Sequence, residues 1–377
     1  MSNESGKHVQ ELLDQFDLEL PLERARTIPS SWYLDREMYA LECRAIFGNT
    51  WQAIGRVDQV AAAETFFTAD LAGEPIVVVR DGQGELRAFY NVCRHRAARV
   101  VAEAQGCSKR LRCPYHGWTY DLQGRLRGTP EFDGVEEFNR SENGLIPVAV
   151  AKWGPFVWVH LGAQPPALTQ YLAPLPERTA NLGLERLQFV ERREYRLACN
   201  WKVFIDNYLD GGYHLNSVHP GLAGVLDYTE YRTEIAGLTS VQSSPLRGSN
   251  PEEKIGRVRM GERAYYWWIF PNFMINIYEG VMDTNLVMPA GPDEWRVIFD
   301  FYFADAEAPG RRQAIADSVA VAHQIQLEDI GICEEVQKGL ASRSYETGRF
   351  SVRREGAGYH FHGLAAKYLK ESLVIGR

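Results

Sequence analysis

The stretch CRHRAARVVAEAQGCSKRLRCPYH, residues 93–116, contains two pairs of metal-ligand residues. Cys93 and His95 form the first pair, with one residue between them, and Cys113 and His116 form the second, with two residues between them. A short apolar run precedes Cys93, and a proline and a glycine flank the second pair, so each pair is expected on a loop between strands. Two such loops would hold a metal group between them.

Two thiolates and two imidazoles suit a [2Fe–2S] cluster of the Rieske type, in which one iron keeps two cysteines and the other takes two histidines. A structural zinc site is the alternative, but zinc fingers usually group cysteine with cysteine and histidine with histidine. The sequence therefore predicts a one-electron carrier at Cys93, His95, Cys113 and His116.

The length and composition place limits on the rest of the chain. With 377 residues the chain exceeds a single core of ordinary size, so a second domain is expected beside the cluster. Hydrophobic residues make up 45% and the formal charge is −8, which indicates a globular protein and argues against binding to nucleic acid or to an anionic membrane. The sequence has no long apolar run and no basic, apolar leader, which favours a cytoplasmic protein.

The hydrophobic pattern predicts an α+β fold. An N-terminal all-β domain around the cluster should be followed by a mixed α+β domain with an antiparallel sheet and helices. We expect a helical lead-in at 1–48 that packs on the second domain, the cluster domain at 49–165 and the second domain at 166–377. Within them we expect a helix at 35–47, a proline-rich linker at 164–176, strand-like segments at 266–277 and 295–303, and a long helix at 311–340.

A second group of metal-ligand residues lies in the stretch NWKVFIDNYLDGGYHLNSVHP, residues 200–220, which contains His214 and His219. Two histidines and one carboxylate on one face of a metal form the site of non-heme Fe(II) oxygenases, with open positions for dioxygen. Asp329 is the expected third ligand, because charged residues interrupt an otherwise apolar helical pattern there.

These two motifs, in this order, resemble those of the Rieske non-heme iron oxygenases, and the resemblance to their terminal α subunits covers nearly the whole chain. The stretch NYLDGGYH, residues 207–214, looks closest to choline monooxygenase and other oxygenases of quaternary ammonium compounds. The resemblance implies that Cys93, His95, Cys113 and His116 bind the [2Fe–2S] cluster and that His214, His219 and Asp329 bind the mononuclear Fe(II).

The resemblance also implies a homotrimer in which electrons cross from one subunit to the next through a bridging carboxylate. The family places this carboxylate three residues before the first iron histidine, but position 211 is a glycine here, so Asp210 is the expected substitute. No glycine-rich dinucleotide fingerprint is evident, so a separate reductase or ferredoxin should deliver electrons from NAD(P)H.

A quaternary ammonium substrate would be recognised mainly by aromatic faces. Tyr208, Tyr213, Tyr266 and Trp268 are the candidate contacts, and Glu279 and Asp283 would add negative potential. Two other functions stay open from the sequence. One is an oxygenase or O-demethylase of a neutral aromatic substrate with the same metals, and the other is a non-catalytic Rieske electron carrier or redox sensor.

Overall fold

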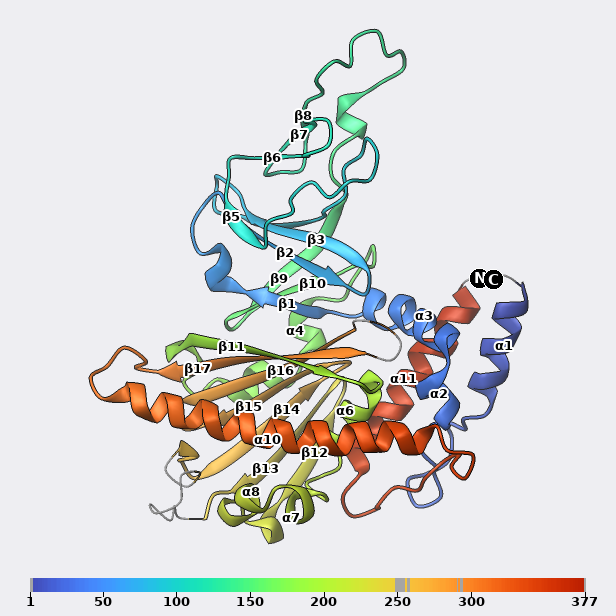
Figure 1. Cartoon of the computed structure of the whole chain (residues 1–377), viewed down its shortest axis with the longest axis vertical. Helices are drawn as coiled ribbons and strands as arrows, with labels where there is room; N and C mark the ends of the chain where they lie inside the picture. Colours follow the sequence, from blue (N-terminus) through green and yellow to red (C-terminus); the bar gives the residue numbers. More distant parts are fainter. Residues whose placement is uncertain (1–2, 248–254, 256–257, 290, 292–293, 376–377) are drawn as a thin grey trace. The chain divides into compact units, whose positions relative to one another are not determined.

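The structure is a computed structural model that describes residues 3–247, 255, 258–289, 291 and 294–375. The chain forms two compact units (Figure 1). The β unit is Phe47–Leu168, and the α+β unit combines Met1–Ile46 with Thr169–Arg377. The N-terminal segment therefore folds together with the C-terminal half, and the β unit is inserted between them in the sequence.

The β unit contains a seven-stranded and a three-stranded antiparallel sheet. The strand order is β1-β10-β9-β4-β3-β2-β5 in the larger sheet and β6-β7-β8 in the smaller one. The strands are β1 (Gln52–Arg56), β2 (Thr65–Leu71), β3 (Glu74–Arg80), β4 (Leu86–Tyr90), β5 (Gln105–Cys107), β6 (Arg110–Arg112), β7 (Thr119–Asp121), β8 (Leu126–Gly128), β9 (Pro147–Trp153) and β10 (Phe156–His160). Short 3-10 helices lie at Phe47–Asn49, Val57–Val60 and Arg140–Glu142.

The α+β unit is built on a seven-stranded antiparallel sheet with the order β11-β17-β16-β15-β14-β13-β12. Its strands are β11 (Leu187–Leu197), β12 (Arg232–Ala236), β13 (Thr239–Pro245), β14 (Arg263–Ile269), β15 (Phe273–Tyr278), β16 (Val281–Pro289) and β17 (Trp295–Ala304). Strands β13 to β17 are almost continuously buried, as expected for a sheet that is covered on both faces.

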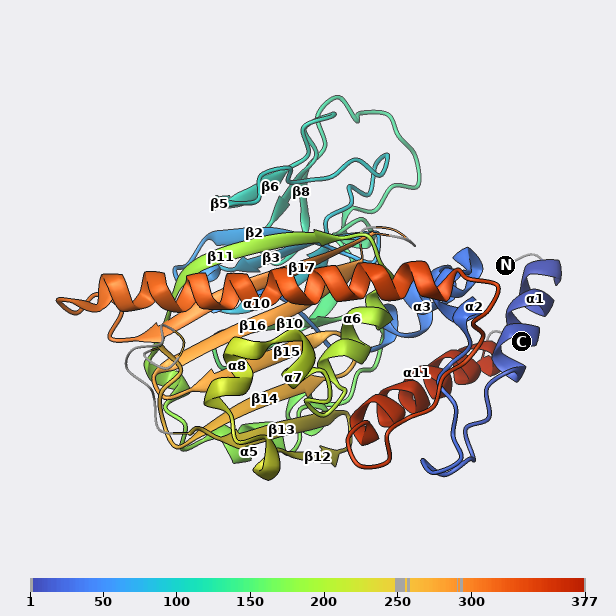
Figure 2. The same ribbon diagram turned by 60° about the horizontal axis from the view of Figure 1, so that its bottom comes forward.

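Helices cover this sheet and gather at one end of it (Figure 2). They are α1 (Asn3–Asp14), α2 (Ser30–Leu34), α3 (Arg36–Ala45), α4 (Leu168–Tyr171), α5 (Leu175–Thr179), α6 (Trp201–Tyr208), α7 (Leu215–Val218), α8 (Pro220–Val225), α10 (Arg311–Leu340) and α11 (Gly356–Ile375), with 3-10 turns at Leu184–Arg186 and Tyr228–Glu230. Helix α10 runs along the same face of the sheet as α6, α7 and α8 (Figures 1 and 2), and α6 packs against both α10 and β16. Helices α1 and α3 pack against α11, so the two ends of the chain lie together.

A buried ion pair ties the N-terminal segment to α6. The Lys202 Nζ atom lies 2.5 Å from Glu42 Oε1, and both side chains are fully buried. The Trp201 indole N–H donates to the other Glu42 oxygen at 2.8 Å. Because each buried charge has its partner, this cluster holds α3 and α6 in one geometry. This ion pair was not predicted from the sequence.

The predicted α+β fold with antiparallel sheets is confirmed, and the long helix α10 has the expected bounds. Two local predictions are corrected. Residues 266–277 form a hairpin of β14 and β15 rather than one strand-like segment, because Pro271 lies in the turn between them. The expected linker at 164–176 includes α4 and the start of α5, whose Pro176 lies in the first helical turn, where its missing N–H is not needed. Within the described residues, every helix is too short or too polar to cross a lipid bilayer.

Candidate metal centres and substrate cavity

The two cysteine-histidine loops of the β unit have the same backbone hydrogen bonds. The Cys93 N–H donates to the Ala98 carbonyl at 2.8 Å, and the Ala97 N–H donates back to the Cys93 carbonyl at 3.0 Å. The loop at Cys113 repeats both bonds at the same offsets and distances. Ala97 and its counterpart Gly117 both have positive φ, at 57° and 74°, which is uncommon for a residue other than glycine. One turn is thus built twice, and each copy carries a cysteine and a histidine.

The cysteines and histidines of these loops differ in burial. Cys93 and Cys113 are 3% and 2% exposed and belong to the apolar core of the β unit, whereas His116 is exposed. The rings of His95 and His116 lie 4.6 Å apart between centroids, and His95 stacks on Trp118 at 4.9 Å. The buried Nδ1 atom of His95 has no hydrogen-bond partner among the described residues. An unpaired ring nitrogen beside a second imidazole fits a metal ligand.

The hydroxyl of Tyr120 connects the first loop to one thiol. It accepts a hydrogen bond from the Arg94 N–H at 3.0 Å and lies 3.4 Å from Cys93 Sγ. Since the lone pair toward Arg94 is used, the hydroxyl hydrogen is free to point at the sulfur. Burial raises the pKa of Tyr120, so the hydroxyl keeps its proton. A hydrogen bond to a cluster sulfur is one of the factors that set a reduction potential.

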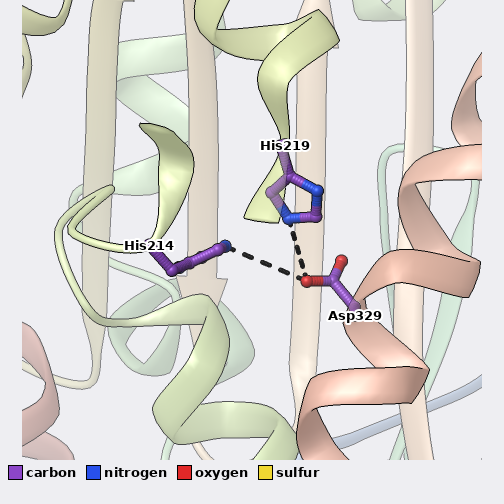
Figure 3. Close-up of side chains that lie close together, drawn as sticks. All are labelled: His214, His219 and Asp329. Carbon is purple, nitrogen blue, oxygen red and sulfur yellow. Dashed lines mark hydrogen bonds and ion pairs between the residues drawn. The ribbon is translucent and has the colours of Figure 1, made fainter. Parts of the chain in front are cut away.

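The second group of ligands forms in the α+β unit, where α10 faces α7 and α8. His214, His219 and Asp329 bring one donor atom each to within 4.8 Å of one another (Figure 3). Asp329 Oδ1 lies 3.0 Å from His219 Nε2 and 3.9 Å from His214 Nε2. Helix α10 supplies the carboxylate, while His214 precedes α7 and His219 ends it. One ion could therefore bind all three side chains.

Each of the two histidines has its outer nitrogen held by a carboxylate. His214 Nδ1 lies 2.5 Å from Asp210 Oδ2, and His219 Nδ1 lies 2.7 Å from Glu328 Oε2. A carboxylate accepts the proton at Nδ1, which leaves the lone pair of each Nε2 directed at Asp329. Burial by itself would lower the pKa of His219, but the hydrogen bonds and charges of Asp329 and Glu328 raise it. Two neutral imidazoles and one carboxylate fit a ferrous ion with open coordination positions.

The loop between α6 and α7 explains the departure at position 211. Gly211 has a φ of 70°, and a Cβ atom built on it would lie 2.1 Å from the carbonyl oxygen of Arg354. No side chain fits there, so a carboxylate three residues before His214 is excluded. Asp210 is the carboxylate that contacts His214, since its Oδ2 atom lies beside the ring Nδ1 and also accepts the His214 backbone N–H at 2.8 Å.

A cavity lies beside these ligands and is lined in part by them. Its roof comes from α6, α8 and α10, and its floor is a row of directly opposed residues on neighbouring strands, which are Gln242, Tyr266, Asn276 and Asp283. The aromatic side chains on its wall are Phe204, Tyr208, Tyr231, Tyr266, Tyr278 and Phe299. The cavity thus joins the metal ligands to a polar, aromatic surface of the sheet.

The structure brings only part of the predicted aromatic set into this cavity. Tyr208 and Tyr266 line it. Tyr213 is 58% exposed and lies outside the described lining. Trp268 shares a strand face with Tyr266 but is covered by α11, where its ring meets Phe361 at 5.7 Å, so it contributes to the core instead.

Several residues of the site were not found from the sequence. Glu328 immediately precedes Asp329, and this position in the sequence was the only signal that could have identified it. Asn207, which donates to Asp329 Oδ1 at 2.7 Å, lies in the quoted motif but had no assigned role. Arg259 and Tyr231 lie in loops. The register of the neighbouring strands determines whether these loops reach the cavity. Of the two acidic candidates, Asp283 lines the cavity and Glu279 is exposed.

Comparison with protein families agrees with this division of the chain. Residues 50–139 match the family model described as the Rieske [2Fe-2S] domain. Residues 184–371 match the model described as the ring hydroxylating alpha subunit, catalytic domain. The first range contains both cysteine-histidine loops, and the second contains the three converging ligands.

Curated relatives cover almost the whole chain. The chloroplastic choline monooxygenase of Arabidopsis thaliana is 40% identical over 373 residues, which are 96% of this chain and 87% of that protein. The carnitine monooxygenase oxygenase subunit of Escherichia coli K12 is 28% identical over 362 residues, covering 93% of this chain and 95% of that protein.

Solved structures give the same family. The quaternary ammonium Rieske monooxygenase CntA in complex with L-carnitine is 26% identical with a TM-score of 0.79, over 91% of this chain and 96% of that one. Naphthalene 1,2-dioxygenase from Rhodococcus, at 19% identity and a TM-score of 0.77 over 98% of both chains, shares the fold. The chain therefore belongs to the Rieske non-heme iron monooxygenases, whose catalytic subunits carry a [2Fe–2S] cluster and a mononuclear iron.

Proposed function

We propose that this enzyme hydroxylates a quaternary ammonium compound of the choline, glycine betaine, carnitine or stachydrine type. The observation that carries the proposal is the set of tyrosines around the cavity beside the three ligands. The similar proteins named above act, by their names, on choline and carnitine, and both of these compounds carry a trimethylammonium group.

The tyrosine hydroxyls are already engaged within the protein. Tyr266 and Tyr278 share a hydrogen bond of 2.8 Å, Tyr231 donates to Gln242 at 3.1 Å, and Tyr208 donates to Asn276. The rings are therefore what the cavity offers to a substrate. A quaternary ammonium has no N–H group to donate, and each aromatic face in contact with it contributes about 0.5 to 2 kcal/mol.

We further propose that Cys93, His95, Cys113 and His116 hold the cluster and that His214, His219 and Asp329 hold the mononuclear iron. Bound iron would supply the activation of dioxygen for attack on a C–H bond. Overall, the substrate, dioxygen, two electrons and two protons give the hydroxylated product and water. The task of Asp210 and Glu328 is to keep both Nε2 atoms directed at the metal, and that of Asn207 is to fix the Asp329 carboxylate.

The electrons come, in this proposal, from a reductase or ferredoxin that oxidises NAD(P)H. They would pass from the cluster of one subunit, by way of Asp210 of the next, to the mononuclear iron within a homotrimer. Asp210 supports this role because its carboxylate contacts His214 through both the ring and the backbone. A solved CntA structure is described as giving insights into inter-subunit electron transfer, which is consistent with such a route.

The other two functions fit the cavity less well. A neutral aromatic substrate has no use for the buried charges of Asp283 and Arg259 in the wall. An electron carrier or redox sensor needs neither the cavity nor the three converging ligands.

Substrate-dependent oxygen consumption tests the proposal. The iron-loaded protein, reduced chemically or by a ferredoxin system, is incubated with choline, glycine betaine, carnitine, stachydrine and a set of aryl methyl ethers. Turnover of a quaternary ammonium compound is expected, with an aldehyde if the alcohol carbon of choline is attacked and formaldehyde if an N-methyl group is attacked. Turnover of the ethers alone would contradict the proposed substrate class.

A further inference from the structure

A buried pair of opposite charges, Asp283 and Arg259, lies in the wall of the cavity. Asp283 sits on β16, at the end of the polar row on the cavity floor, and is 3% exposed. Arg259 is also 3% exposed and comes from the segment before β14. Charged side chains are seldom buried without a specific role or partner, so the contacts of this pair indicate what it does.

The Asp283 carboxylate is only half used. Its Oδ2 atom accepts a hydrogen bond from the Asn276 amide at 2.7 Å. Its Oδ1 atom has no hydrogen-bond partner among the described residues, and the nearest charge, Arg259 Nη2, is 3.7 Å away. That separation is an ion pair but too long for a hydrogen bond. One acceptor oxygen of this cavity-lining residue is therefore buried without a hydrogen-bond partner.

Arg259 is held by two contacts, although its Nε atom, like Asp283 Oδ1, is buried without a hydrogen-bond partner among the described residues. Its Nη1 atom donates to Ser318 Oγ on α10 at 3.1 Å, and its guanidinium lies 4.5 Å from the centre of the Tyr278 ring. The positive charge beside Asp283 favours the ionised carboxylate, against the effect of burial, which raises the pKa of this group. Arg259 thus serves as an anchored counter-ion and leaves Oδ1 without a hydrogen bond.

The pair lies on a different part of the wall from the metal ligands. Ser318, which holds Arg259, lies on α10 on the N-terminal side of Asp329. Two neighbouring residues of α6 reach both parts of the wall, since the Tyr208 hydroxyl donates to Asn276, the partner of Asp283, while Asn207 donates to Asp329. A substrate that contacts Asp283 therefore presents its far end to the metal ligands.

The free group at this end suits a cation. A carboxylate oxygen only accepts, and it attracts the polarised methyl groups of a trimethylammonium without requiring an N–H donor. The rings of Tyr266 and Tyr278 line the same cavity, and aromatic rings attract such a cation.

We propose that Asp283 anchors the ammonium head of the substrate and that Arg259 is its fixed counter-ion, so that the carbon farthest from nitrogen faces the metal site. This inference rests on the proposed function and narrows it. It favours a cationic amino alcohol such as choline, attacked at the hydroxyl-bearing carbon, over a zwitterionic betaine that is attacked at an N-methyl group.

The test compares choline with 3,3-dimethylbutan-1-ol, a neutral molecule of the same shape, in the wild-type enzyme and in Asp283→Asn. We expect the wild type to prefer choline, and Asp283→Asn to raise the KM for choline by about tenfold or more while the KM or inhibition constant of the neutral analogue changes by less than about twofold. We also expect some attack at the N-methyl groups of choline in this variant, because the ammonium head is no longer held. Formaldehyde should then appear beside the aldehyde that comes from the alcohol carbon. Equal changes for both ligands, or no change, would overturn the inference.

The matched control is Asp300→Asn. Asp300 is a buried aspartate on the neighbouring strand that pairs with Arg192 at 2.6 Å and lies outside the described cavity lining. It should leave the ratio of the two ligands unchanged. If Asp283→Asn does not fold, Asp283→Glu, which keeps the charge, should retain the preference for choline, and a loss of that preference would count against the anchor. A wild type that oxidises no quaternary ammonium would refute the proposed function itself, whereas choline oxidation with an unaltered preference in Asp283→Asn would refute only the anchor.

Discussion

The carboxylate of Asp210 accepts two hydrogen bonds from one residue, His214, at the ring Nδ1 and at the backbone nitrogen. This double contact fixes the tilt of the imidazole as well as its tautomer. The proposed electron transfer from the neighbouring subunit would reach His214 through this carboxylate.

We expect Asp210→Asn to retain both metal groups and to slow oxidation of the cluster during single turnover by about ten- to a hundredfold. The amide can still contact His214 but lacks the negative charge. Rapid mixing of the reduced enzyme with substrate and oxygen measures the rate. Glu230→Gln, at an exposed carboxylate paired with Arg232, is the control and should have no effect. Wild-type rates in Asp210→Asn would exclude it as the electron bridge.

Glu328→Gln should weaken binding of the mononuclear iron by about ten- to a hundredfold and leave the cluster intact, because His219 loses the carboxylate that orients it. Iron titration, with the visible spectrum of the cluster as internal reference, checks this. Glu335→Gln on the same helix, whose partner is the exposed Lys338, should bind iron like the wild type. Normal iron affinity in Glu328→Gln would show that its hydrogen bond is not needed.

Gly211→Asp, which restores the carboxylate position of the wider family, should disrupt the site rather than improve it. Its Cβ atom would collide with the Arg354 carbonyl, and the positive φ adds strain. We expect a loss of more than about 2 kcal/mol in the free energy of unfolding together with weaker iron binding. Gly339→Ala on α10, where a Cβ meets nothing within 4 Å, should be neutral or stabilising. A stable, active Gly211→Asp enzyme would contradict this account.

Tyr120→Phe should lower the reduction potential of the cluster by roughly 40 mV, the one-electron equivalent of a hydrogen bond of about 1 kcal/mol. The hydroxyl stabilises the sulfur more as the cluster gains negative charge on reduction. A redox titration followed by electron paramagnetic resonance gives the potential. Tyr90→Phe, on β4 of the same unit, should leave it unchanged. An equal potential in Tyr120→Phe would mean that the hydroxyl does not donate to Cys93.

Lys202→Met should destabilise the protein by about 3 to 5 kcal/mol, because Glu42 is left as an unpaired buried charge. Denaturant unfolding measures the loss. The double variant Lys202→Met, Glu42→Gln should recover much of it, since no charge is then stranded. A double variant as unstable as the single one would show that packing, and not charge, is responsible.

The cluster loops could be predicted because all their information is local: Cys93, His95, Cys113 and His116 lie within one short stretch that folds back on itself. His214 and His219 are also close in the sequence. Asp329 could be proposed as the third ligand because charged residues are unusual within an apolar helical pattern. The fold class followed from the periodicity of long segments such as α10.

The cavity wall could not be predicted in the same way. Tyr266, Asn276 and Asp283 become neighbours only through the register of three strands, which no short segment determines. Trp268 was expected to contact substrate, but α11 covers it, and this cover could not be predicted from the strand pattern. No sequence pattern pointed to Arg259, because it is held by Ser318 on α10, which lies far along the chain.

Three consecutive residues of α6 contact three different parts of the α+β unit. Asp206 accepts from Tyr33 of the N-terminal segment at 2.6 Å, Asn207 holds Asp329, and Tyr208 reaches Asn276 on the cavity floor. A rotation of this helix that improves one contact must disturb the other two, so substitutions here should combine non-additively. For anyone wishing to retarget the enzyme to new substrates, Tyr208 is therefore a poor starting position, and the strand residues of the floor offer changes that leave the metal ligands alone.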